Sequence, residues 1–186
     1  EEAGFIDAIE VKIQPDDADW SAGDIRYNVL RWTSSPNPPF GGYGPSFTNP
    51  RTGEILGADI MLEWIYLTNR VRYSEIFENQ EIRENDFCHN SLIKQENRIF
   101  GKLATEALDL NEDEISRVYE EDVYQLILHE VGHTLGLNHN FAASTLHNNS
   151  DVHNPEITYK EGLSSSVMDY HALNIAPIGV EQGQYA

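Results

Sequence analysis

The chain has 186 residues, which fits one domain of ordinary size, and 40% of them are hydrophobic, which excludes a wholly disordered protein. Its 12 lysines and arginines against 31 aspartates and glutamates give a net charge of −19, which argues against nucleic acids and anionic membrane surfaces as partners. The one cysteine, Cys88, excludes an intrachain disulfide, and the most apolar stretch, residues 60–67, is too short to span a bilayer.

The first third of the chain has the patterns of strands and turns. Residues 8–14 alternate between apolar and polar side chains, with Ile9, Val11 and Ile13 on one face, which predicts a half-buried strand. Residues 25–32 predict a second strand, and residues 34–45, which hold four prolines and three glycines, predict an irregular surface loop.

An acidic loop separates these two predicted strands, and its members are Asp16, Asp17, Asp19 and Asp24. Their spacing does not match a calcium-binding EF-hand loop, because Ala22 stands where the sharp turn requires glycine. A solvated loop is therefore the favoured interpretation, and calcium is a possible cofactor that no motif supports.

A hairpin is predicted next, because residues 49–53 (Asn-Pro-Arg-Thr-Gly) have turn chemistry between two apolar segments, residues 43–47 and 55–67. The first arm contains Pro45, which has no N–H to donate to a central ladder. We therefore expect this arm to be an edge strand.

The second half of the chain changes to a helical period. Residues 91–108 have apolar side chains at helical spacing, and Asn111 with Glu114 resembles a capping box that opens a helix reaching Val131. After Gly136 the periodicity ends, which predicts loops with at most short elements. Strands followed by helices indicate an α+β domain.

The end of that helix carries the segment with chemical meaning. His129 and His133 are four residues apart, so their imidazoles lie one turn apart on one face and can bind one ion. Glu130 lies about 100° round the helix from His129, beside such an ion, where it is placed to act as a general base.

His139 is the candidate third ligand. A continuing helix would carry it about 240° away from His133, but Gly136 can adopt a left-handed conformation that ends the helix and returns the chain. Three protein ligands with an open position are typical of catalytic zinc. The other histidines lack ligand spacing, so we expect exposed side chains at His89, His147, His153 and His171.

The segment from His129 to His139 resembles the extended motif of the metzincin clan of zinc endopeptidases, His-Glu-x-x-His-x-x-Gly-x-x-His. About thirty residues later, Met168 in Ser-Val-Met-Asp-Tyr resembles the methionine turn that lies beneath the metal in this clan. In astacin-like and serralysin-like members a tyrosine two residues after the methionine approaches the zinc. The resemblance therefore implies that Tyr170 binds zinc or donates a hydrogen bond to the oxyanion. The alternative is that Tyr170 only packs against the turn.

Residues 37–67 resemble matrixins, in which an edge strand borders the cleft and binds the substrate backbone. The resemblance implies substrate contacts for Tyr43, Gly44, Pro45, Ser46 and Phe47 in this strand. By analogy with the clan, Ile175, Ala176 and Pro177 in residues 174–178 would line the pocket for the side chain after the cut.

The resemblance implies a metzincin (zincin-like) domain with a twisted mixed sheet, an active-site helix and a loop-rich end beyond the methionine turn. We expect a single domain over residues 1–186, cut from a longer protein, with subdomains at 1–136 and 137–186. Like similar bacterial zinc metalloproteases, it is expected to be extracytoplasmic, although this chain carries no signal peptide. A monomer is expected, although nothing in the sequence determines the oligomeric state.

The predicted function is zinc-dependent cleavage of peptide bonds in extended protein substrates, with one catalytic zinc and Glu130 as the general base. The alternative is a zinc-binding module that recognises peptides with little or no turnover. Glu130 argues against this alternative, because a site that only binds has no need of a base there.

Overall fold

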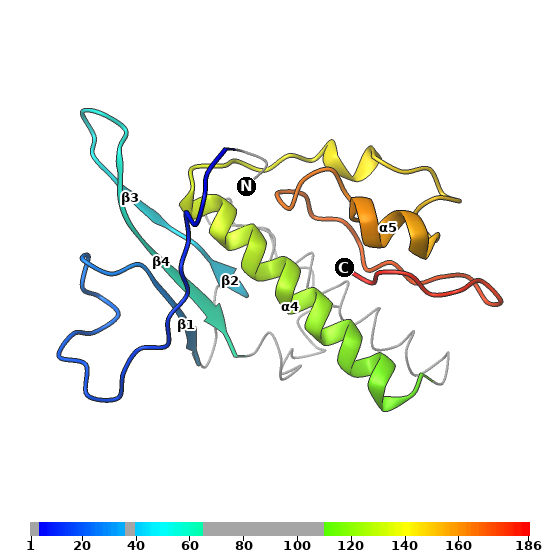
Figure 1. Cartoon of the computed structure of the whole chain (residues 1–186), viewed down its shortest axis with the longest axis horizontal. Helices are drawn as coiled ribbons and strands as arrows, with labels where there is room; N and C mark the ends of the chain where they lie inside the picture. The colour runs from blue at the N-terminus through cyan, green and yellow to red at the C-terminus, as the bar shows by residue number, and fades with distance from the viewer. Residues whose placement is uncertain (1–3, 36–39, 65–109) are drawn as a thin grey trace, which may run out of the picture.

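A computed structural model of the chain describes residues 4–35, 40–64 and 110–186 (Figure 1). Its elements in chain order are β1 (Val29–Thr33), β2 (Gly42–Tyr43), β3 (Ser46–Thr48), β4 (Ile55–Glu63), α4 (Glu112–Thr134), the 3-10 helix η1 (Ala143–Thr145) and α5 (Pro155–Glu161). The strands precede the helices and form a mixed sheet, which confirms the predicted α+β class.

The nine-residue strand β4 organises the sheet. It pairs with β1 in parallel orientation and with β2 and β3 in antiparallel orientation. The turn between β3 and β4 is closed by hydrogen bonds from Asn49 N to Glu54 O (2.8 Å) and from Gly53 N to Asn49 O (2.8 Å). Since β2 and β3 pair only with β4 in the described part of the chain, the predicted hairpin and its edge arm are confirmed.

Helix α4 packs its C-terminal half on the sheet, where Leu126 joins Ile60 and Leu62 in the buried core. The helix begins at a capping box: Asn111 Oδ1 accepts from Glu114 N, and Glu114 Oε2 accepts from Asn111 N, both at 3.0 Å. This confirms the predicted start, and the acidic residues of the first turn also suit the helix dipole.

The prediction of a strand at residues 8–14 is wrong. The segment is irregular, and its apolar side chains are exposed, at 63% for Ile9, 90% for Val11 and 95% for Ile13. Alternation only favours an extended chain with one apolar face, and a strand also needs a neighbouring strand that bonds to it. No described strand pairs with this segment.

Two further boundaries differ from the sequence prediction. The strand predicted at residues 25–32 is β1, which begins later because residues 24–27 form a turn with a hydrogen bond from Tyr27 N to Asp24 O (3.0 Å). The loop predicted at 34–45 contains the short strand β2. The helix predicted at 91–108 lies outside the described residues.

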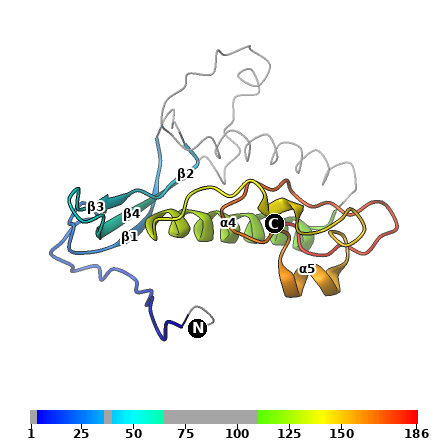
Figure 2. The ribbon, with the colours of Figure 1, turned by 90° about the horizontal axis from the view of Figure 1, so that it is seen from above.

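Beyond α4 the chain has only η1 and α5 as short helices, as predicted. The strands lie against the C-terminal half of α4, and α5 lies beside the helix nearer its other end (Figures 1 and 2). The C-terminal end of α4, the edge of the sheet and the loops that follow the helix therefore meet in one region, which holds the candidate site. None of the described helices is long and apolar enough to cross a bilayer.

Candidate metal centre

The first two histidines are oriented by backbone carbonyls. His129 is fully buried, and its Nδ1 lies 2.7 Å from Val167 O. The Nδ1 of His133 lies 3.0 Å from Leu137 O. A carbonyl only accepts hydrogen bonds, so both Nδ1 atoms donate to it, and Nε2 is the ring nitrogen that remains for a metal.

The third histidine is returned to the helix by its C-terminal stop. Gly136 has φ of +87°, its N–H donates to His133 O (2.9 Å), and the N–H of Leu137 donates to Gly132 O (3.1 Å). These two bonds and the left-handed glycine make a Schellman motif. The expectation that Gly136 ends the helix and redirects the chain is confirmed.

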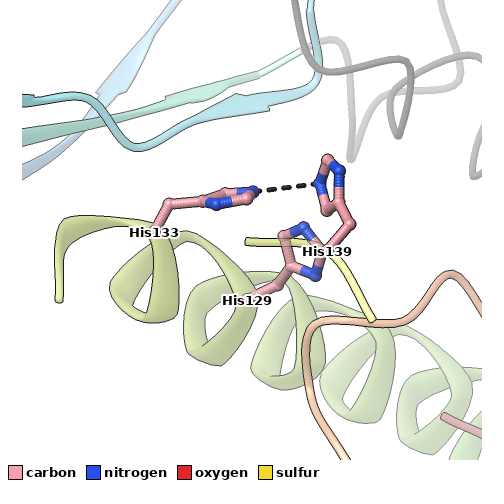
Figure 3. Close-up of side chains that lie close together, drawn as sticks. All are labelled: His129, His133 and His139. Atoms are coloured by element: carbon pink, nitrogen blue, oxygen red, sulfur yellow. Dashed lines mark hydrogen bonds between the residues drawn. The ribbon is translucent and has the colours of Figure 1, made fainter. Parts of the chain in front are cut away.

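The three imidazoles then face one another (Figure 3). Their candidate ligand atoms lie within 4.8 Å of one another, and the Nε2 atoms of His133 and His139 are 3.1 Å apart. A tetrahedral zinc ion bound at about 2.0–2.1 Å holds its nitrogen ligands about 3.3–3.4 Å apart. The donor set therefore fits a zinc ion, and the pair of His133 and His139 lies close to this spacing.

Charge and burial favour the neutral form that a metal needs at His139. Burial, together with the neighbouring His133, lowers the pKa of His139 below its ordinary value. Within residues 4–35, 40–64 and 110–186, the three histidines are the group of side chains close enough to hold a metal ion. The aspartates of the N-terminal loop form no such group, and Asp24 instead pairs with Arg26 at 2.5 Å.

Glu130 lies under the edge of the sheet. Glu130 is 1% exposed, and the backbone of residues 42–44 approaches it closely. A Cβ on Gly42 would lie 2.7 Å from Glu130 Oε1, and one on Gly44 would lie 2.5 Å from Glu130 O. Glycine at both positions therefore lets the edge strand lie directly against the predicted general base.

Met168 and Tyr170 come from a turn that packs against the same helix. Met168 is 2% exposed, and a Cβ on Gly132 would overlap its sulfur. The hydroxyl of Tyr170 contacts His139 Nε2 and lies 3.4 Å from its Nδ1. The structure thus brings the three histidines, Glu130, Met168, Tyr170 and the edge strand to one place.

The remaining substrate-binding candidates differ in their surroundings. In the edge strand Tyr43, Pro45 and Ser46 are half-buried, and Phe47 is 46% exposed.

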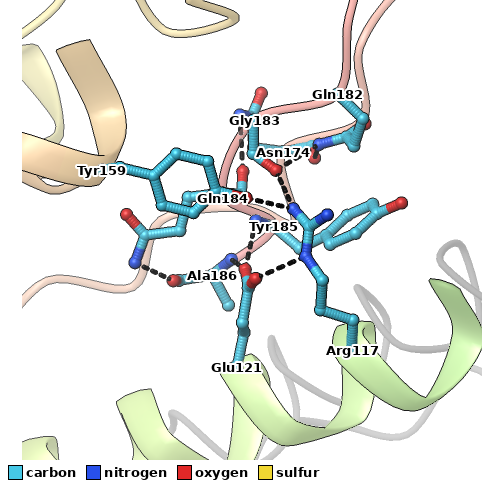
Figure 4. Close-up of polar contacts among 9 residues, drawn as sticks. All are labelled: Arg117, Glu121, Tyr159, Asn174, Gln182, Gly183, Gln184, Tyr185 and Ala186. Atoms are coloured by element: carbon cyan, nitrogen blue, oxygen red, sulfur yellow. Dashed lines mark hydrogen bonds and ion pairs between the residues drawn. The ribbon is translucent and has the colours of Figure 1, made fainter. Parts of the chain in front are cut away.

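The candidates near the C-terminus, Ile175, Ala176 and Pro177, follow Asn174, whose N–H donates to Tyr185 O (2.8 Å). Ala176 N donates to Gln182 Oε1 (2.8 Å). These hydrogen bonds tie residues 174–176 to residues 182–185, the segment that is held on α4 (Figure 4).

The prediction of exposed side chains at the other histidines is wrong for the three that are described. His147, His153 and His171 are half-buried, and His147 Nε2 lies 2.7 Å from Gly162 O. The loops after α4 fold back on themselves, so polar neighbours in the sequence do not imply exposure. His89 lies outside the described residues.

Two residues at the site were not singled out by the sequence. Phe141 is 65% exposed, and its ring lies 5.5 Å from the rings of His139 and Tyr170. The sequence did carry a signal for Phe141, because it is an aromatic residue two positions after the third histidine. Asp169 is 4% exposed and accepts hydrogen bonds from two backbone N–H groups, for which the sequence offers no periodic or spacing signal.

A comparison with known protein families finds a similarity in the C-terminal part of the chain. Residues 111–186 match a family model described as Met-zincin. No curated protein and no solved structure gives a significant match. The matched segment contains α4, the three histidines and the methionine turn, and together they indicate a site of the zinc metalloprotease type.

Proposed function

With residues 111–186 matched to the Met-zincin family, we propose that this chain is a zinc-dependent endopeptidase that cleaves extended peptide substrates. The observation that carries the proposal is the position of Glu130. Glu130 directly follows His129, the first histidine of the cluster, and its carboxylate lies against the backbone of the edge strand. Base, metal ligands and strand edge therefore meet at one point.

The three histidines would hold the zinc ion, and three protein ligands would leave one position for water or substrate. When bound, the ion would supply Lewis acidity, which polarises a carbonyl and lowers the pKa of water towards about 7. Glu130 takes a proton from the attacking water and later delivers it to the leaving amine, so that the carboxylate is regenerated.

Tyr170 is placed to assist at the developing negative charge. Its hydroxyl lies at His139, and its ring centroid is 4.5 Å from that of His139 and 5.2 Å from that of His129. A phenol at this position can donate a hydrogen bond to the oxyanion of the tetrahedral intermediate or bind the resting metal.

The substrate would lie extended along β2 and β3. These strands form the antiparallel edge, and a peptide can add to such an edge through main-chain hydrogen bonds. Phe47 and Phe141 are both exposed and offer apolar surface to the side chains of the peptide. The substrate class is therefore an unfolded or loop segment of a protein rather than a compact small molecule.

The proposal is tested with a library of peptides and three proteins: wild type, Glu130→Ala and the nearly isosteric Glu130→Gln, each loaded with zinc. Mass spectrometry would locate the cuts, and metal analysis would give the zinc content. We expect cleavage by wild type and a loss of at least about 100-fold in both variants at one zinc per chain.

Two results would contradict the proposal. Cleavage by a clean Glu130→Ala preparation at the wild-type rate would exclude Glu130 as the base. A wild-type chain that binds one zinc ion and many peptides but cuts none would instead be a peptide-recognition module.

A further inference from the structure

The loop that carries His139 and the turn that carries Met168 are joined along their length by hydrogen bonds. Asn140 N donates to Met168 O (2.9 Å), and Ser165 N donates to Ala143 O (3.1 Å). In the same turn, Val167 O accepts a hydrogen bond from His129 Nδ1. The orientation of the first ligand and the position of the third ligand therefore depend on one pair of segments.

Asp169 is the acidic side chain at the centre of this junction. Its Oδ2 accepts from Ser144 N at 2.6 Å, and its Oδ1 accepts from Tyr170 N at 2.7 Å. One oxygen thus holds η1, which follows His139 by a few residues. The other oxygen holds the backbone of Tyr170, whose hydroxyl contacts His139.

This carboxylate is nearly inaccessible, with 4% of the residue exposed. A buried carboxylate is stabilised only by donors with good geometry, and hydrogen bonds to a charged acceptor are stronger than those between neutral groups. The bond from Ser144 N resists separation of the loop from the turn, and the bond from Tyr170 N fixes the backbone within the turn itself.

We propose that Asp169 is a positioning residue of the metal centre, which fixes His139 and Tyr170 relative to the helix and thereby sets the affinity for zinc. The proposal rests on the zinc site of the proposed function and assigns a role to a side chain that is not itself a candidate ligand. Residues that orient metal ligands typically contribute about 10- to 100-fold to metal affinity.

The chain offers a matched control in Glu121. This carboxylate on α4 also accepts from two backbone N–H groups, those of Tyr185 (2.5 Å) and Ala186 (3.4 Å), and it also joins a loop to the body of the molecule (Figure 4). It lies two turns before His129 on α4 and faces the C-terminal segment. Its loss should lower stability without moving a ligand.

The experiment compares wild type with Asp169→Asn, Asp169→Ala and Glu121→Gln. Zinc dissociation constants are measured by competition with a chromophoric chelator, at a temperature where circular dichroism shows each apo chain folded. Visible absorption of the cobalt-loaded chains reports the coordination geometry. Asp169→Asn keeps the shape and one acceptor oxygen, so it remains informative if Asp169→Ala does not fold.

We expect Asp169→Asn to bind zinc about 10- to 100-fold more weakly than wild type and to change the cobalt spectrum. Glu121→Gln should change neither, although its melting temperature falls. Zinc binding by Asp169→Asn within about threefold of wild type, with an unchanged cobalt spectrum, would overturn the proposal, as would an equal loss in Glu121→Gln. A wild-type chain that binds no zinc would overturn this proposal and the proposed function together.

Discussion

Residues 8–14 and residues 137–146 both lie outside the strands and α-helices, but they differ in what holds them. In the first segment Val11 and Ile13 are almost fully exposed. In the second, Leu137 N bonds to the end of α4 and Asn140 N bonds to the methionine turn. Specific hydrogen bonds and close contacts therefore hold an irregular segment in place, whether or not its sequence is periodic.

The turn that holds Asn140 of the second segment is itself packed on α4, through Met168 against Gly132. Among changes that act on this segment we expect Gly132→Ala to have the largest effect, because its methyl group would overlap the buried sulfur and displace the turn. Overpacking of this kind costs about 1–3 kcal/mol, and the displaced turn should also weaken zinc binding. Chemical denaturation and zinc competition would measure the two effects.

The double variant Gly132→Ala with Met168→Ala is the control. Once the sulfur is removed, the added methyl group no longer overlaps it, and alanine is the better helix former by about 0.8–1.0 kcal/mol. Gly132→Ala should therefore stabilise the Met168→Ala protein. A destabilisation of equal size in both backgrounds would show that the contact does not carry the effect.

The helix stop is expected to have the next largest effect. Gly136→Ala places a side chain at φ of +87°, which costs about 1–2 kcal/mol, and relaxation of the backbone would move His139. We expect zinc affinity to fall by about 10-fold or more.

Gly179→Ala provides the comparison, because this glycine has φ of +85° and open space around it. It should lose a similar free energy of unfolding while zinc affinity stays unchanged. Equal losses of zinc affinity in the two variants would contradict a specific role of the helix stop.

The smallest effects are expected in the first segment. Val11→Ser and Ile13→Ser should change the free energy of unfolding by less than about 0.5 kcal/mol, because both side chains are already exposed. Leu126→Ala in the core should cost about 2–5 kcal/mol in the same denaturation assay. A loss above about 1 kcal/mol at Val11 or Ile13 would mean that this segment packs against the fold in solution.

Local chemistry explains which features the sequence could predict. The capping box of Asn111 and Glu114, the stop at Gly136 and the turn before β4 each depend on a few neighbouring residues, and all three are found as predicted. The ligand spacing of His129, His133 and His139 follows from helix geometry and that stop.

The rest depends on residues that are distant in the sequence. The close approach of Gly42 to Glu130 needs the sheet to pack on α4, and the bond from Ser144 to Asp169 joins residues 25 positions apart. Neither contact has a periodic signal. Residues 8–14 show the converse, because their alternation is visible in the sequence while the neighbouring strand that would bury them is not.

If the three histidines bind one zinc ion, X-ray absorption at the zinc edge of the loaded chain will show it. We predict one zinc per chain, with three imidazole nitrogens at about 2.0–2.1 Å and one further light ligand, and one imidazole fewer in His139→Ala. A zinc–sulfur distance of about 2.3 Å, which would place the ion at Cys88, or a spectrum unchanged by His139→Ala, would contradict the account.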